Sequence, residues 1–303
     1  MFEIWVPISI AAAFLQNVRS ALQKHLKGRL STSGATMTRF IYAIPFAALY
    51  AYSLNTWGGF DWPKPNSRFV VYMMTGGLTQ ISATALLVYL FSFQNFAVGT
   101  TFSKTETVQA AIFGAFVLSD PLSLGAVFAI FISLIGVVVL SVARERTMTL
   151  RTVLTSWTGK PALIGLASGA CFGISAVSYR AASLSLGGEG FLMQAAFTLA
   201  CVTIFQTCVM TAYLIIREPA ELMRVLKSWK ISMWVGLSGM AASAGWFTAM
   251  TIQNAAYVRA LGQIELLFTF AVSLLFFKEQ TNVKEISGIL LICSGILMLL
   301  LYV

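Results

Sequence analysis

Long apolar stretches with few charges dominate this sequence, and they restrict it to folds that can cross a lipid bilayer. A helix that spans the hydrocarbon core of a membrane needs about 20 predominantly apolar residues. Only 10% of the residues are charged and 58% are hydrophobic, whereas soluble domains usually have about 25% charged residues. Ten successive segments have a suitable length and composition: 3–24, 34–54, 69–92, 96–118, 122–143, 161–183, 190–216, 230–251, 255–277 and 284–302. We therefore predict an all-α integral membrane protein with ten transmembrane helices embedded in the lipid bilayer.

The connections between these segments are too short to fold on their own. The longest are residues 55–68, 144–160 and 217–229. The first residues, MFEIWVPISIAAAF, have neither the basic start nor the small-residue cleavage site of a secretory signal. We interpret them as the first span, and we predict a multi-pass protein of the cell membrane, meaning the inner or plasma membrane.

An internal repeat becomes visible when the sequence is shifted by 159 residues against itself, without a gap over the last three spans of each half. The pairs that coincide include Gln94 with Gln253, Asn95 with Asn254, Glu106 with Glu265, and acidic Asp120 with acidic Glu279. Several coincidences at one offset indicate a duplication. We predict two five-helix repeats, 1–143 and 161–303, connected by residues 144–160.

An odd number of spans in each repeat has a consequence for topology. After five crossings the second repeat enters the membrane from the opposite side, so the two repeats are inverted. Secondary transporters use inverted repeats to build one site near the midplane and to open it to either side in turn. A channel is the alternative from another class, but channels usually form a filter or a charged ring from symmetric subunits. The repeat therefore favours a secondary active transporter that works by alternating access.

The residue patterns of an enzyme are missing from the sequence. Its single histidine, His25, lies beside Lys24 at the end of the first span. We find no metal-ligand spacing, no nucleophile motif and no glycine loop for phosphate, so we predict no catalysis, no cofactor and no metal. The net charge of +9 lies almost entirely between the spans, where it is typical of a topology signal and not of a nucleic-acid site.

With ten spans in two halves, the chain resembles the drug/metabolite transporter superfamily, and within it the EamA-type transporters. The residues that carry the resemblance are the Gln-Asn pairs before the fourth and ninth spans, the acidic residues after those spans (Asp120 and Glu279), and the glycines of the fifth and tenth spans. The resemblance covers the whole chain. It implies a central cavity lined mainly by spans 1, 3, 4, 6, 8 and 9, and export or exchange of small metabolites, often driven by protons.

Two glutamates lie deep in predicted spans, where an ionisable residue is costly and usually functional. Glu106 and Glu265 each follow a Gln-Asn pair by about eleven residues, which places them about 16 Å along their helices. Lys104 and Arg259 lie in the same spans but on other sides of the helices, so we expect pairs between the repeats, Glu106 with Arg259 or Glu265 with Lys104. We predict that Glu106 or Glu265 carries protons; the alternative is that both acids only neutralise these cations and hold the two spans together.

Three deep cations, Arg19, Lys104 and Arg259, outnumber the two acids. This excess favours an anionic or zwitterionic ligand, and guanidinium groups match carboxylates bidentately. We therefore predict a small polar metabolite with a carboxylate, such as an amino acid or an organic acid, anchored by Arg19 or Arg259. The alternative is an exporter of multiple cationic drugs. The predicted substrate-binding residues are Asn17, Arg19, Lys104, Tyr179, Trp246 and Arg259.

The connections on one side of the membrane carry thirteen Lys and Arg residues, whereas the opposite side carries Lys64 and Arg68. The positive-inside rule places the thirteen in the cytoplasm and both termini outside, although the family resemblance implies cytoplasmic termini.

As partners we expect lipid, a small-molecule substrate and protons, but no nucleic acid, and we expect a monomer or a weak homodimer. Asn95 and Asn254 each precede a helix and are predicted to cap it.

Overall fold

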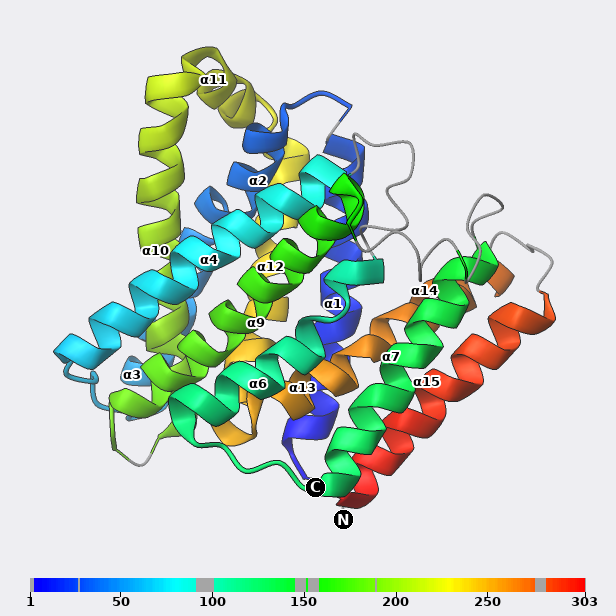
Figure 1. Ribbon diagram of the computed structural model, residues 1–303. Coiled ribbons are helices and arrows are strands. Elements are labelled where there is room, and N and C mark those ends of the chain that lie inside the picture. Colours follow the sequence, from blue (N-terminus) through cyan, green and yellow to red (C-terminus); the bar gives the residue numbers. More distant parts are fainter. Residues whose placement is uncertain are drawn as a thin grey trace. The chain divides into compact units, whose positions relative to one another are not determined.

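The part of the chain that the structure describes consists of helices and short connections. The computed structural model describes residues 3–26, 28–90, 101–144, 151, 158–188, 190–275 and 282–302. Figure 1 shows the helices, whose bounds are α1 Trp5–Leu26, α2 Thr32–Ile41, α3 Ile44–Thr56, α4 Ser67–Leu90, α6 Glu106–Leu118, α7 Leu124–Arg144, α9 Lys160–Ser185, α10 Phe191–Arg217, α11 Pro219–Lys227, α12 Trp229–Ile252, α13 Ala255–Leu261, α14 Glu265–Leu275 and α15 Val283–Tyr302.

Within the described ranges, five helices are long and apolar enough to cross a membrane: α4, most of α7, α9, α10 and α15. Each coincides with a predicted span, and α1 and α12 also run unbroken through one. The predicted count of ten is not confirmed, because the remaining three spans are interrupted or extend outside the described residues. These three are 34–54, 96–118 and 255–277.

The second predicted span is divided between α2 and α3. Pro45 lies in the first turn of α3, where its missing N–H group and fixed φ angle are compatible with a helix start but not with a helix interior. The Tyr42 hydroxyl, at the break, donates a hydrogen bond to the Val225 carbonyl oxygen at 3.0 Å. A proline in this segment therefore converts one expected helix into two.

The fourth and ninth predicted spans are also interrupted, and at corresponding places. Helix α6 begins at Glu106, after a turn at residues 104–105, and α14 begins at Glu265, after a 3-10 turn at Gly262–Ile264. The two helix starts are separated by 159 residues, which is the offset of the sequence repeat. The expectation of continuous helices was wrong here, because periodicity does not reveal a change from α to 3-10 hydrogen bonding.

The chain divides into two compact units that do not follow the division at residues 144–160. The first unit contains Met1–Ile81 and Ser175–Gln253, and the second contains Ser82–Ile174 and Asn254–Val303. Each unit therefore combines a stretch of the first predicted repeat with a stretch of the second. The repeat itself, and its inverted orientation, remain predictions.

Close helix packing in the second unit depends on glycine. Helices α7 and α15 lie side by side (Figure 1). A Cβ atom added to Gly136 would lie 2.8 Å from the Gly288 carbonyl oxygen, and one added to Gly288 would lie 2.7 Å from the Leu140 nitrogen. A Cβ on Gly295 would likewise lie 2.7 Å from the Ser133 nitrogen. The two backbones therefore touch, as small residues permit in membrane helices.

Candidate functional site

The second unit contains a cluster of four charged residues at the two helix breaks. The ammonium group of Lys104 forms an ion pair with the Glu265 carboxylate, and the Arg259 Nη1 atom lies 3.9 Å from the Glu106 Oε1 atom. Lys104 also interacts electrostatically with Glu106 and Arg259. Both cross-repeat pairs that the sequence suggested are therefore present.

The positions of these four residues follow from where the helices start and end. Glu106 and Glu265 lie in the first turns of α6 and α14, and Arg259 lies in the last turn of α13. A helix has partial positive charge at its N-terminus and partial negative charge at its C-terminus. Each of these three charges is therefore stabilised by its own helix end as well as by its partner.

The cluster contains as many cations as acids. Its side chains are 10 to 25% exposed, so they are largely withdrawn from solvent. The predicted excess of one cation came from counting Arg19 together with Lys104 and Arg259 against the two glutamates. Arg19 belongs to the first unit, whereas the cluster has two cations and two acids. Protonation of either carboxylate would remove one negative charge and release the partner cation from its pair.

Two glutamines that the sequence reading did not select lie in the same unit. The Oε1 atoms of Gln109 and Gln263 are buried and have no hydrogen-bond partner among the described residues. The Gln109 Nε2 atom donates to the Thr105 Oγ1 atom at 3.1 Å, in the first turn before α6. A buried amide oxygen without a hydrogen-bond partner is costly, so these two oxygens are candidates for contact with a ligand or water. The sequence could have indicated both glutamines, because each is an amide side chain inside an otherwise apolar predicted span.

A buried hydrogen-bond network joins three helices of the first unit. The Tyr179 hydroxyl of α9 donates to the Gln80 Oε1 atom of α4 at 3.0 Å. The Gln206 Nε2 atom of α10 lies 2.9 Å from the same oxygen and 3.2 Å from the Tyr179 hydroxyl. The Tyr179 ring stacks on Phe247 with the centroids 4.4 Å apart. Gln206, only 2% exposed, was missed because its partners are distant in sequence.

A small cavity borders this network. It has about 10 Å³ of space for a water molecule, the lower limit for holding one. Arg39, Gln80, Gln206 and Gly239 are among the lining residues. A Cβ atom on Gly239 would lie 3.1 Å from the Arg19 Cδ atom, so Arg19 passes beside the same wall. The predicted residues Arg19 and Tyr179 thus lie in one polar region of the first unit.

Like Arg19 and Tyr179, the predicted residues Asn17 and Trp246 of the first unit are not among the residues that line this cavity. The Trp246 indole N–H donates to the Gln16 Oε1 atom at 3.0 Å and is 6% exposed, so it joins α12 to α1. Asn17 is half-buried on α1. In the second unit, the Asn254 side chain accepts a hydrogen bond from the Ala256 N–H at 2.9 Å, which confirms the predicted cap of α13. Asn95 lies outside the described residues.

Removing the Tyr179 hydroxyl should lower the stability of the first unit. Tyr179→Phe removes the donor to Gln80 and leaves a buried amide network incomplete, which should lower the free energy of unfolding by about 1 to 2 kcal/mol. Thermal unfolding in detergent would measure the change. Tyr213→Phe is the matched control, because Tyr213 is exposed on α10. An unchanged midpoint for Tyr179→Phe would contradict a stabilising role for the network.

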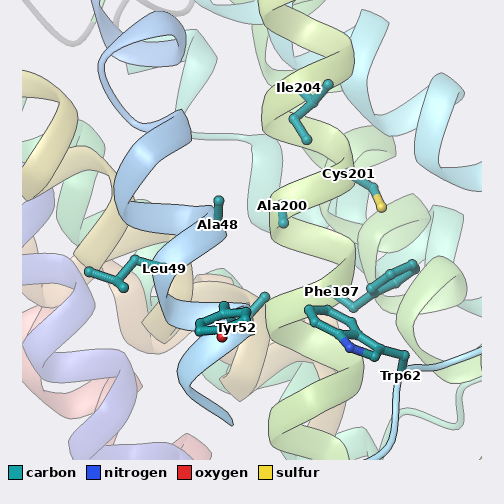
Figure 2. Close-up of a pocket in the computed structure, with 9 residues that line it drawn as sticks. Ala48, Leu49, Tyr52, Trp62, Phe197, Ala200, Cys201 and Ile204 are labelled. Atoms are coloured by element: carbon teal, nitrogen blue, oxygen red, sulfur yellow. The ribbon is translucent and has the colours of Figure 1, made fainter. Parts of the chain in front are cut away.

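Figure 2 shows a larger hollow in the first unit that has a different character. Its volume is about 580 Å³, and all of its lining residues are apolar or aromatic apart from Cys201. The rings of Trp62 and Phe197 meet edge to face with centroids 6.2 Å apart. Among the residues that the structure describes, no charged or amide side chain lines the hollow, so it offers a ligand an apolar surface. The ion-pair cluster and the polar region around Tyr179 are therefore the candidate functional sites.

Comparison with known proteins was made by sequence and by fold. Residues 159–301 match the EamA-like transporter family. A search of curated proteins found no match. One solved structure, described only as the crystal structure of a protein, is 14% identical, and the alignment covers 98% of this chain and 96% of that one with a TM-score of 0.72. At this identity the likeness shows a shared fold over nearly the whole chain.

Proposed function

We propose, from the match of residues 159–301 to the EamA-like transporter family, that this multi-pass membrane protein is a secondary active transporter that exports or exchanges a small polar metabolite by alternating access. The cell membrane is its proposed location, and protons are its proposed coupling ion. The observation that carries the proposal is the ion-pair cluster of Lys104, Glu106, Arg259 and Glu265 at two helix breaks.

Interrupted helices support a transport mechanism. Transporters with inverted repeats commonly form their ion and substrate sites where membrane helices are discontinuous, because the helix ends supply charge and free backbone groups. The starts of α6 and α14 are related by the repeat offset, and both begin with a glutamate. An arrangement of this kind gives each repeat one carboxylate at its helix break.

Proton coupling is supported by the partners of these carboxylates. When Glu265 is deprotonated, its charge holds Lys104, and Glu106 similarly holds Arg259. A proton on either acid would release its cation and change the balance of the cluster. Because the four charges come from both predicted repeats, this release is the proposed trigger for one repeat to move against the other.

The proposed substrate carries a carboxylate. Arg19 or Arg259 is its proposed anchor, and Arg259 also lies 3.9 Å from the Glu106 carboxylate. Arg19 is 9% exposed and passes beside Gly239, and Gly239 lines a small cavity together with Gln80 and Gln206. A guanidinium group stays charged when buried and binds a carboxylate through two parallel hydrogen bonds.

A thermal-shift screen on the purified protein would test the substrate class. Amino acids and organic acids should raise the unfolding temperature, and Arg19→Ala should remove this response. Arg68→Ala is the matched control, because Arg68 is exposed at the start of α4, and it should keep the response. Stabilisation by lipophilic cations alone, unaffected by Arg19→Ala, would overturn the carboxylate proposal and favour a multidrug exporter.

A further inference from the structure

Helix α11 has three distinct faces, although it is only nine residues long. Glu221 and Val225 are buried and lie one turn apart, on the side that packs against the rest of the first unit. At about 100° per residue, Met223 and Leu226 form an exposed apolar face, and Arg224 and Lys227 form an exposed basic face beside it. Such a helix suits a boundary between water and lipid.

The acids of this segment are turned towards α2 and its preceding loop. Glu218 accepts hydrogen bonds from the hydroxyls of Ser31 at 2.8 Å and Ser33 at 3.0 Å. The Glu221 carboxylate accepts from the Ser31 backbone N–H at 2.5 Å, and its other oxygen lies 3.3 Å from Arg224. Both carboxylates are therefore used within the protein, and Glu221 also contacts Arg224 of the exposed basic face.

The exposed side carries positive charge. Arg217 ends α10, Lys227 ends α11 and Lys230 lies in the first turn of α12, and all three are exposed. Met223 is 54% exposed, Leu226 44% and Trp229 50%. Exposed cations beside exposed apolar and aromatic side chains, at the end of a membrane-spanning helix, complement a surface that is anionic at its headgroups and apolar beneath them.

We propose that α11, together with the end of α10 and the start of α12, is a binding site for anionic phospholipid. Arg217, Lys227 and Lys230 bind the headgroup phosphate, and Met223, Leu226 and Trp229 insert at the boundary with the acyl chains. The hydrogen bonds of Glu218 and Glu221 to the start of α2 hold the segment in place. This site requires only that the protein resides in a membrane, so it is independent of the transported substrate.

The full-length protein in neutral detergent provides the test. Phosphatidylglycerol should raise the unfolding temperature and should bind at least about tenfold more tightly than phosphatidylcholine in native mass spectrometry, as expected for several cations at an anionic surface. The triple variant Arg217→Gln/Lys227→Gln/Lys230→Gln should lose this preference. The control Lys64→Gln/Arg68→Gln/Lys160→Gln removes three other exposed cations and should retain it.

Further measurements distinguish the sources of binding. Raising the salt concentration should reduce the lipid preference of the unmodified protein, because exposed charges are screened. This measurement uses the unmodified protein, so it tests the proposal even if the triple variant does not fold. Met223→Ser/Leu226→Ser should weaken binding of the lipid. Equal affinity for the two lipids, full preference in the triple variant, no effect of salt, or equal stabilisation by inorganic phosphate alone would each overturn the proposal.

Discussion

Gradient-driven uphill transport should be lost when both carboxylates of the ion-pair cluster are neutralised. In the double variant Glu106→Gln/Glu265→Gln, neither helix break retains its carboxylate, the group proposed to take up and release the proton, so a pH gradient should drive no accumulation above that of protein-free liposomes. Exchange or substrate binding should be partly retained, because neither proposed role requires proton transfer. Transport of radiolabelled substrate into proteoliposomes would measure both activities.

The charge partners make a control for folding necessary, because removing one member of a buried pair can destabilise a protein by about 3 to 5 kcal/mol. The exchanged pair Lys104→Glu/Glu265→Lys keeps one cation and one acid in contact and should restore stability if pairing alone matters. Glu285→Gln removes a carboxylate from the start of α15, outside the cluster, and should transport normally. Full proton-driven accumulation by the double glutamine variant would disprove proton transfer by these residues and leave exchange or facilitated diffusion.

A large loss of stability should follow from Gly288→Leu on α15. A Cβ atom at this position would lie 2.7 Å from the Leu140 nitrogen and 3.0 Å from the Gly136 carbonyl oxygen. These are backbone atoms and cannot move as a flexible side chain would, so α7 and α15 must separate. We expect a decrease of about 3 kcal/mol in the free energy of unfolding, at the upper end of the usual range for overpacking.

Thermal unfolding in detergent, together with the amount of monodisperse protein, would measure this effect. Ser294→Leu is the matched control, because Ser294 is exposed on the same helix, and a leucine there should be tolerated in an apolar environment. If Gly288→Leu unfolded at the same temperature as the unmodified protein, close contact between the α7 and α15 backbones would not be needed for stability.

Local properties of the sequence were sufficient for the class of fold and for part of the candidate site. Apolar length identified α4, α7, α9, α10 and α15, because each must satisfy its backbone hydrogen bonds within the helix. Charge complementarity identified the pairs of Glu106 with Arg259 and of Glu265 with Lys104, because the residues on one helix point in different directions. The cap at Asn254 followed from the preference of a short polar side chain for the first turn of a helix.

Other features depended on residues that are far apart in the chain. Gln206 joined the site only because α4, α9 and α10 bring it to Gln80 and Tyr179, and no local pattern distinguishes it from other amides. The change to a 3-10 turn at Gly262–Ile264 depends on hydrogen-bond geometry, to which apolar periodicity is insensitive. The compact units also mix the two halves of the sequence.

The sequence by itself therefore determined that the chain is helical and membrane-spanning, and which acids and cations require partners, because apolar length and uncompensated charge are properties of single segments. Only the tertiary structure decided where the helices break, which stretches form each unit, and that Arg19 lies beside the wall formed by Gly239 while Lys104 and Arg259 are paired with acids. Those features arise from packing between distant segments, where the free energy of a contact depends on both partners and on the space between them.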